Sequence, residues 1–391
     1  MSNIVNLNID ELKDFYRHIV KNNRFIQAKG KVPVAIEVVG ESGIGKTSSI
    51  IQLADELGLH LVKLNLAQIE EIGDLVGFPI RQFEMALGEE SFWIDENAIE
   101  ETVKQGYSFT GKNRMEYCPP KWIAGKGEHG VLLLDDWNRA DIRFIQAVMD
   151  LIDRQQYISW SLPKDWHIVL TSNPDNGEYI VNTIDPAQRT RFITTNLKFD
   201  VHCWSRWAER EEIDGRCINF LLLHPEIVSR NINARSIVMF FNSISSIENF
   251  DKSLPLIQMI GEGSVGEEFS TLFSLFINNK LDKLLSPEEI LYKHDVNDII
   301  TKLYDQIGID DKYRADIAST IATRIINYCV YSLKDIPVDI NLVNRIATII
   351  LAKVFSMDIC YNLIKQIYTS NTKFKLMSTN KDLVKYITQS C

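Results

Sequence analysis

The chain has 391 residues, of which 45% are hydrophobic and 24% charged, and its formal net charge is −10. This composition is typical of folded globular proteins and excludes a largely disordered chain. The length allows two or three compact domains. The acidic balance argues against non-specific binding to nucleic acid or to an anionic membrane.

Neither the cysteines nor the apolar stretches indicate a secreted or membrane protein. The six cysteines, at positions 118, 203, 217, 329, 360 and 391, lack the close spacing of a zinc site or a disulfide framework. The N-terminus soon becomes polar and shows no secretory signal. The most apolar stretch, 346–355, is interrupted by Thr348 and Lys353 and is too short to span a membrane. We therefore expect a soluble cytoplasmic protein with reduced thiols.

The first half of the chain alternates predicted helices and strands. Leu12, Tyr16 and Ile19 recur at helical spacing and predict one amphipathic helix with a basic connector over residues 1–30. Hydrophobic strand-like segments follow, separated by helical stripes, at 34–39, 59–65, 131–134, 168–170 and 192–197. Strands that alternate with helices predict a parallel sheet covered on both faces. We expect this α/β core to occupy residues 31–199.

The second half, residues 200–391, is predicted to be helical. Strand signals fade, and apolar residues recur every four positions, as at Ile317, Ile321, Ile325 and at Leu342, Ile346, Ile350. We expect a helical lid domain followed by a C-terminal helical extension. Beyond about residue 290 no motif indicates a role for the extension.

Residues 40–47 read G-E-S-G-I-G-K-T and match the phosphate-binding pattern G-x-x-x-x-G-K-[ST]. Glycines let successive backbone N–H groups point at phosphates, and the following helix presents its positive N-terminal end. Lys46 is placed to reach the β- and γ-phosphates of ATP, and the Thr47 hydroxyl to bind Mg²⁺. The predicted nucleotide-binding residues are Gly40, Glu41, Ser42, Gly43, Ile44, Gly45, Lys46, Thr47 and Ser48.

Two further polar groups are predicted at the ends of buried strands. Residues 131–136 read V-L-L-L-D-D, which places Asp135 beside the loop as a Mg²⁺ ligand and Asp136 as the residue that polarises the attacking water. Residues 171–174 read T-S-N-P, and Asn173 is placed to orient that water. Taken alone, a pair of aspartates indicates a solvated loop and Asn-Pro only a turn; the preceding strands favour the functional interpretation.

The order of these motifs resembles that of the MoxR-type AAA+ ATPases and of the dynein and midasin modules. The resemblance covers residues 34–240 and rests on D-L-V-G at 74–77, L-L-D-D-W-N-R-A at 133–140, T-S-N-P followed by Glu178-Tyr179, and P-A-Q-R-T-R-F at 186–192. It implies a P-loop AAA+ αβα sandwich with a parallel sheet and a helical lid. ATP and Mg²⁺ are the cofactors that it implies.

The resemblance also implies roles for individual polar residues. Asn173 matches the sensor-one asparagine, and Arg191 matches the arginine finger that reaches the ATP of a neighbouring subunit, with Arg189 as the alternative. Arg235, in N-A-R-S at 233–236, matches the sensor-two arginine of the lid. For each arginine the competing interpretation is a surface ion pair. The family forms rings, usually hexamers, that act on partner proteins, often a protein with a von Willebrand factor A domain.

One position departs from the family pattern. Family members usually carry Glu where this chain has Asp136, and the shorter side chain draws the carboxylate back from the water. A slow ATPase, or an ATP-gated assembly module with little turnover, is therefore an alternative to a remodelling motor. A metabolic kinase is disfavoured, because it leaves Asn173, Arg191 and Arg235 without a purpose.

Residues 104–126 form a predicted insertion that differs in charge from the rest of the chain. Five basic side chains face one acidic side chain, a net charge of +4, and four aromatic residues are interleaved with them. Basic and aromatic residues together can grip a polymer such as nucleic acid, so a nucleic-acid motor or loader is a further alternative. The competing interpretation is a solvated insertion whose aromatic rings pack on the core. A second hairpin is predicted within residues 155–166.

Overall fold

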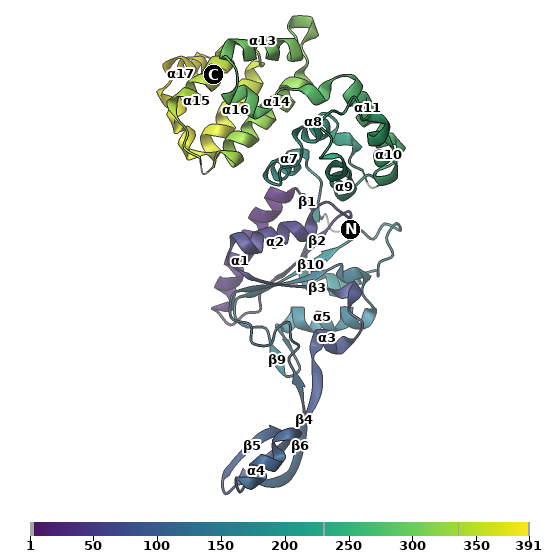
Figure 1. The fold of residues 1–391 in the computed structure, drawn as a ribbon. Helices are drawn as coiled ribbons and strands as arrows, with labels where there is room; N and C mark the ends of the chain where they lie inside the picture. Colours follow the sequence, from purple (N-terminus) through teal and green to yellow (C-terminus); the bar gives the residue numbers. More distant parts are fainter. Residues whose placement is uncertain (1–3, 230, 335, 390–391) are drawn as a thin grey trace. The chain divides into compact units, whose positions relative to one another are not determined.

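The computed structural model (Figure 1) describes residues 4–229, 231–334 and 336–389. The chain folds as two compact units, Met1–Lys198 and Phe199–Cys391. The first unit is an α/β structure built around a parallel sheet, and the second unit is helical.

The sheet of the first unit has six strands among the described residues, and every neighbouring pair is parallel. Its order is β1 (Val5–Leu7), β11 (Phe192–Leu197), β2 (Ala35–Val39), β10 (Trp166–Ser172), β7 (Gly130–Asp135) and β3 (His60–Asn65). The central strands β7 and β10 are buried along their whole length, as expected for a parallel sheet covered on both faces.

Alternate residues of the strands supply two separate hydrophobic cores. On one face Val131 and Leu133 of β7 pack with α1 (Ile9–Gln27) and α2 (Lys46–Glu56). On the other face Leu132 and Leu134 pack with α3 (Ile72–Val76) and α5 (Ile142–Arg154). The period of two along each strand thus produces the layered sandwich.

The N-terminal segment differs from the single helix predicted for residues 1–30. Strand β1 precedes α1 and pairs with β11, and the Lys198 amide donates to the Leu7 carbonyl at 2.8 Å. Asn8 then starts the helix with a capping box, because its side chain accepts from the Glu11 amide while the Glu11 carboxylate accepts from the Asn8 amide. Three residues are too few to show the alternation from which a strand is predicted.

An antiparallel arm leaves the first unit between α3 and β7 (Figure 1). It consists of β4 (Phe78–Leu87), β5 (Glu90–Asp95), α4 (Ile99–Lys104) and β6 (Ser108–Cys118), with β4 in the centre of the three strands. Gly77 begins the arm with φ +89, and a Cβ atom there would lie 2.0 Å from the Cys118 carbonyl oxygen. Only glycine therefore fits the point at which the two outer ends of the arm meet.

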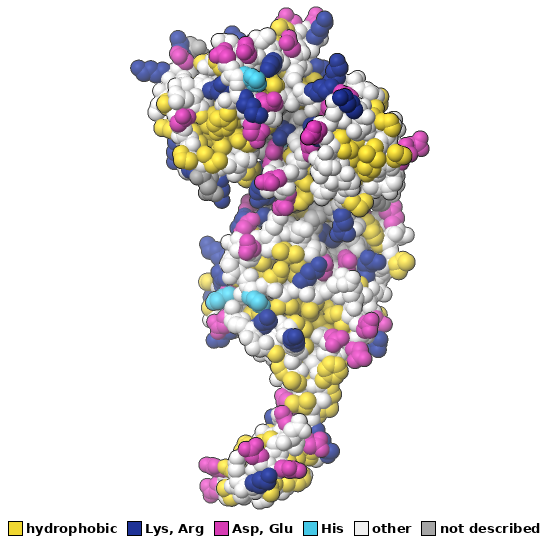
Figure 2. Space-filling view, viewed as in Figure 1, with side chains coloured by type: hydrophobic (Ala, Val, Ile, Leu, Met, Phe, Trp, Pro, Cys, Tyr) yellow, Lys and Arg dark blue, Asp and Glu magenta, His cyan; other side chains and the backbone are white. Residues whose placement is uncertain are grey.

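The arm changes the interpretation of the basic segment predicted at 104–126. The antiparallel sheet begins at Phe78, well before that segment, and β6 is only one of its strands. Residues 78–118 carry four basic and eight acidic side chains, a net charge of −4. Lys112 pairs with Glu84 at 3.0 Å, and Arg114 pairs with Glu116 at 3.3 Å. Acidic side chains are prominent on the face of the arm seen in Figure 2.

The aromatic residues near the base of the arm pack on the core, as the competing interpretation expected. The hairpin predicted within 155–166 is present as β8 (Gln156–Tyr157) and β9 (Trp160–Ser161). Trp160 and Trp122 meet edge to face at 5.5 Å between ring centroids, and Tyr117 and Tyr157 meet at 6.2 Å. The Trp160 indole donates to the Val76 carbonyl at 2.9 Å. These rings fix the arm's base and are not available as a row of stacking surfaces.

The second unit is helical throughout its regular structure, which confirms the predicted fold class of a parallel-sheet α/β core followed by a helical region. Its α-helices are α7 (Val201–Arg210), α8 (Gly215–Leu223), α9 (Ala234–Ile244), α10 (Leu254–Ser264), α11 (Glu267–Asn278), α12 (Pro287–Tyr292), α13 (Val296–Ile307), α14 (Ala315–Asn327), α15 (Ile340–Leu351), α16 (Met357–Ser370) and α17 (Lys381–Gln389). A π-helical segment, η7 (Tyr328–Ser332), continues α14. The remaining helices of the two units are α6 (Pro186–Arg189) and short 3₁₀ segments at 66–68, 96–98, 137–139, 225–227, 281–283, 310–312 and 372–379.

The helical unit holds two hydrophobic cores. The first lies among α7–α11 and is rich in phenylalanine, with Phe220 and Phe273 4.9 Å apart at the ring centroids. The second lies among α12–α17 and is mostly aliphatic. The apolar stretch predicted to be a buried helix contributes Ile346 and Ile350 to this core as part of α15. Among the described residues no helix is both long and apolar enough to cross a membrane.

A buried ion pair connects these two cores. The Arg324 guanidinium on α14 bonds to the Glu209 carboxylate on α7, and only about a tenth of either side chain is exposed. Arg324 also donates to the Asn219 side-chain oxygen and to the Gly215 carbonyl, both at 2.9 Å. Burial raises the pKa of Glu209, and the neighbouring Arg324 opposes that rise. Removing the arginine would leave a buried carboxyl group without its partner.

We expect Arg324→Leu to destabilise the helical unit by about 3–5 kcal/mol, the cost of breaking one side of a buried pair. Arg314→Leu is the matched control, because the Arg314–Asp316 pair is about half exposed and such pairs contribute about 1 kcal/mol or less. Urea unfolding followed by circular dichroism measures both variants. Equal losses of stability would contradict the structural role of Arg324.

Candidate functional site

The loop between β2 and α2 contains the predicted phosphate-binding residues. Gly43 and Gly45 have φ of +78 and +98, and no side chain caps the first turn of α2. At Gly40 a Cβ atom would lie 2.7 Å from Ile44 Cδ1 and 3.0 Å from the Leu197 carbonyl oxygen. The loop therefore needs its glycines, and the amides at the start of α2 are left for another acceptor.

Lys46, the first residue of α2, extends its side chain back into the loop. Its ammonium nitrogen donates to the carbonyl oxygens of Gly40 at 2.6 Å and Glu41 at 2.9 Å. It also donates to the Asn173 side-chain oxygen at 3.2 Å, and the residue is 7% exposed. The lysine thus connects the loop to the end of β10, two elements that the sequence predicted to share one site.

Asp135 ends β7 beside the first turn of α2. One of its carboxylate oxygens, Oδ1, accepts hydrogen bonds from the Thr47 and Thr171 hydroxyls, each at 2.6 Å. The other, Oδ2, pairs with the Lys63 ammonium at 2.9 Å. Burial alone would raise the pKa of Asp135, but the bonds from Thr171, Thr47 and Lys63 outweigh it and lower the pKa. Asp135 is therefore an anion at neutral pH.

Asp136 and Asn173 form the next part of the cluster. The Asn173 side-chain nitrogen donates to the Asp136 carboxylate at 3.2 Å, and its oxygen is the acceptor for Lys46. Asp136 has φ +51, in the left-handed region that aspartate tolerates better than most residues. Its amide donates to the Thr171 hydroxyl at 3.2 Å. A non-glycine residue held in this conformation at a strand end is typical of functional sites.

Asn138 supports Asn173 and was not predicted as a site residue. Its side chain donates to the Asn173 carbonyl at 2.8 Å and accepts from the Asn173 amide at 3.3 Å. Asn138 in turn accepts from the Asn182 amide at 2.7 Å through its own carbonyl. The signal was present in the sequence, because Asn138 belongs to the motif at 133–140, but its partner lies 35 residues further along the chain.

Tyr179 lies against the glycine-rich loop, although the sequence motif that contains it indicated no role for its side chain. Its hydroxyl donates to the Glu41 carboxylate at 2.7 Å and accepts from the Ser42 amide at 3.2 Å. The segment after β10 therefore touches the same loop that Lys46 occupies. Burial and the neighbouring Glu41 raise the pKa of Tyr179, so the phenol is neutral over the ordinary pH range.

Glu37 is a second group that the sequence did not identify. It appears there only as an interruption of a hydrophobic strand, yet it is 6% exposed and accepts three hydrogen bonds. The donors are the Trp137 indole at 2.9 Å, the Ser172 hydroxyl at 2.8 Å and the Thr194 hydroxyl at 3.0 Å. Glu37 thereby ties β2 to β10, β11 and the turn that carries Asp136.

The three predicted arginines lie outside this cluster of contacts. The Arg191 Nε atom pairs with the Asp153 carboxylate at 2.5 Å, and about a third of each side chain is exposed. The Arg189 Nε atom donates to the Ile184 carbonyl at 3.3 Å. Arg235 lies on α9 in the helical unit. The structure thus brings together the loop, Asp135, Asp136 and Asn173, whereas the described contacts of Arg191 and Arg189 are with other residues.

Thr47 and Asp135 offer the hard oxygen ligands that Mg²⁺ prefers. Their oxygens are already 2.6 Å apart, and within the described ranges no group of three or more His, Cys, Asp or Glu side chains is placed to hold a metal. Mg²⁺ commonly binds through one or two protein ligands together with phosphate oxygens and waters. The donor set therefore fits Mg²⁺ that arrives with a nucleotide.

A glycine-rich loop between a parallel strand and a helix, with an aspartate at the end of a non-adjacent strand, defines a P-loop α/β core. Neither a protein-family model nor a curated protein matches the chain. Among solved structures the chain is similar to two variants of Thermotoga maritima RuvB. The first has 13% identity and a TM-score of 0.36, covering 79% of this chain and 89% of that chain. The second has 12% identity and a TM-score of 0.34, covering 95% and 90%. It is also similar to the T. maritima RuvB Holliday junction branch migration motor, with 12% identity, a TM-score of 0.32 and the same coverage.

Proposed function

We propose that the chain is an AAA+-type ATPase that binds Mg·ATP at the cluster around Lys46, Thr47 and Asp135. The observation that carries the proposal is that a single set of contacts joins these residues to Asp136 and Asn173. Lys46 donates to Asn173 at 3.2 Å, Asn173 donates to Asp136 at 3.2 Å, and Thr47 donates to Asp135 at 2.6 Å. Cation, metal ligand and water-orienting group are the parts that phosphoryl transfer requires.

Each residue has a chemical task in this proposal. The Lys46 ammonium exchanges its loop carbonyl partners for phosphate oxygens, which are stronger, charged acceptors. Thr47 and Asp135 hold the metal, and Mg²⁺ when bound neutralises charge on the phosphates. The Asn173 side-chain nitrogen orients the attacking water, and the Asp136 carboxylate accepts its proton. Asn138 and Glu37 keep both groups in place.

The finer assignment follows the MoxR-type resemblance. We infer a ring, by family default a hexamer, in which Arg191 of one subunit completes the ATP site of its neighbour, with Arg189 as the alternative. Arg235 would sense nucleotide from the helical lid. Developing charge on the phosphoryl group rewards a positioned guanidinium. The ring would remodel or activate a partner protein in the cytoplasm, such as a von Willebrand factor A-domain protein.

The direct test is ATP turnover across a series of protein concentrations, with the size of the assembly measured in parallel. We expect activity per chain to rise with concentration, to follow a ring-sized species and to require Mg²⁺, because the site is shared between subunits. Turnover by a monomer at constant specific activity would refute the ring, and failure to bind ATP would refute the whole proposal.

An ATP-gated assembly module with little turnover is the second candidate, and Asp136 favours it. This carboxylate is one methylene shorter than the family's glutamate, and Asn173 is already bonded to it at 3.2 Å. ATP-driven assembly without turnover in the same experiment would select this candidate. Asp136→Glu would then be expected to restore hydrolysis. The nucleic-acid alternative loses its main support, because the arm as a whole carries a net charge of −4.

A further inference from the structure

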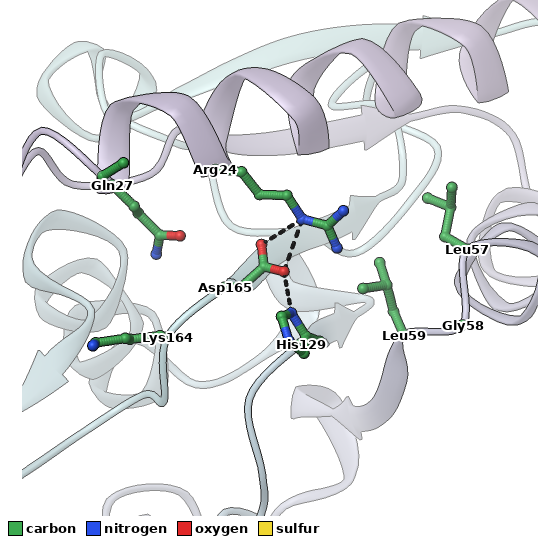
Figure 3. Close-up of a pocket in the computed structure, with 9 residues that line it drawn as sticks. Arg24, Gln27, Leu57, Gly58, Leu59, His129, Lys164 and Asp165 are labelled. Atoms are coloured by element: carbon green, nitrogen blue, oxygen red, sulfur yellow. Dashed lines mark hydrogen bonds and ion pairs between the residues drawn. The ribbon is translucent and has the colours of Figure 1, made fainter.

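A pocket of about 900 Å³ opens at the end of the sheet opposite to the proposed ATP site (Figure 3). Four segments meet there: the end of α1, the end of α2, the residue before β7 and the two residues before β10. The same α2, β7 and β10 carry Lys46, Asp135 and Asn173 at their other ends. The 11 residues of α2 separate the two sites by about 16 Å at 1.5 Å per residue.

Asp165 organises the pocket. Its carboxylate accepts from the Arg24 Nε atom at 2.8 and 3.0 Å and lies 2.5 Å from the His129 Nδ1 atom. The Nε2 atom of buried His167 lies 3.0 Å away. Burial alone would raise the pKa of Asp165, but Arg24 and the histidines outweigh it and lower the pKa. The carboxylate is therefore charged and its acceptor capacity is used within the protein.

Arg24 uses only one edge of its guanidinium group for this contact. Its two terminal nitrogens point away from Asp165 toward Leu57 and Leu59 (Figure 3), and neither has a hydrogen-bond partner within the described part of the chain. About half of the Arg24 side chain is exposed. Two parallel N–H donors at the edge of a guanidinium match the two oxygens of a carboxylate.

The remaining lining selects the kind of anion. Lys164 contributes a second cation, so that Arg24 and Lys164 face only Asp165, leaving one positive charge in excess when His129 is neutral. Leu57 and Leu59 form an apolar wall beside the Arg24 fork (Figure 3). An apolar wall rewards a ligand with a hydrocarbon part, which inorganic phosphate lacks.

We propose that this pocket binds an organic carboxylate, with the Arg24 terminal nitrogens and Lys164 holding the carboxylate and Leu57 and Leu59 covering an apolar group. The site goes beyond the proposed ATPase function and does not depend on it. Its ligand is either a small organic acid or the C-terminal carboxylate of a peptide, because both present the same chemistry.

Hexanoate is the first probe, measured on the full chain by saturation-transfer NMR and calorimetry, with hexanol and inorganic phosphate as comparisons. We expect saturable hexanoate binding that excess Mg·ATP does not displace and that Lys46→Ala leaves unchanged. Hexanol should bind at least about tenfold more weakly, since it lacks the charge that the Arg24 fork recognises. Displacement by ATP, or equally tight binding of phosphate, would overturn the proposal.

Two variants locate the probe. Arg24→Lys retains a cation for Asp165 but loses the fork, and Lys164→Gln leaves the Asp165 contacts untouched; each should weaken hexanoate binding about tenfold. Lys31→Gln, an exposed lysine outside the lining, is the control and should have no effect. If Arg24→Lys proves unstable on heating, Lys164→Gln alone decides. Unchanged affinity in a folded Lys164→Gln chain would refute the assignment.

A pair of short peptides that end in leucine distinguishes the two sources of the carboxylate. One peptide has a free C-terminus and the other is amidated. If the free peptide binds at least about tenfold more tightly than hexanoate and the amidated one does not bind, the ligand is a chain end. If the free peptide is no tighter than hexanoate, the ligand is a small organic acid. Binding of both peptides with equal affinity would show that the carboxylate is not recognised and would contradict the proposal.

Discussion

Replacing Lys46 with alanine is expected to weaken ATP binding at least about a hundredfold, because two charge-assisted hydrogen bonds to phosphate are worth about 3 kcal/mol together. In the structure the ammonium nitrogen already makes three bonds of 2.6–3.2 Å to groups that border the loop. Its reach therefore covers the space that the loop amides surround. Binding of a fluorescent ATP analogue measures the loss directly.

The same three bonds give Lys46 a structural role that must be separated from nucleotide binding. Gly40 and Glu41 would lose a donor to their carbonyl oxygens, which we expect to cost about 1–2 kcal/mol of folding stability. Thermal unfolding of the Lys46→Ala chain measures this cost. Lys31→Ala removes an exposed lysine that lies outside the loop and should change neither quantity. A folded Lys46→Ala chain that binds ATP normally would eliminate the loop as the nucleotide site.

The glycine-rich loop and the strand ends could be predicted because their signals are local. Gly40 to Thr47 are consecutive, and the four apolar residues before Asp135 identify a buried strand without reference to any other segment. In a parallel sheet the carboxyl ends of strands meet at one edge, so placing Asp135 and Asn173 together required only the strand assignments. The bonds among Thr47, Asp135 and Thr171 follow from that edge.

What the sequence missed depends on pairing between distant segments. Lys63 reaches Asp135 only because β3 lies beside β7, and Glu37 is satisfied by donors from three other segments. The basic residues of β6 looked unopposed at 104–126, but Lys112 faces Glu84 of β4, a partner outside that segment. Asp165, Arg24 and His129 of the carboxylate pocket are likewise far apart in sequence. A side chain that interrupts a hydrophobic strand is a signal only when the partner strand is known.

Arg191→Ala tests the shared active site, and its expected effect is the largest after that of Lys46. An arginine finger contributes about 10³–10⁵ to kcat, whereas a half-exposed ion pair contributes about 1 kcal/mol or less to stability. Asp153→Asn is the matched control, since it breaks the same 2.5 Å pair and leaves the arginine in place. We expect both variants to bind ATP and to lose similar stability, while only Arg191→Ala loses turnover. A collapse in Arg189→Ala instead would move the role to that residue.

Mixing two inactive chains then decides whether Arg191 acts on its own subunit or on a neighbour. The Arg191→Ala chain keeps an intact loop, and the Lys46→Ala chain keeps an intact arginine, so an interface that joins them in the right order contains one complete site. In a ring assembled at random from equal amounts, about a quarter of the interfaces are of this kind. Turnover should therefore return on mixing to roughly that fraction, provided that sites act independently. A mixture that assembles but stays inactive would contradict a site shared through Arg191, whatever the size of the ring.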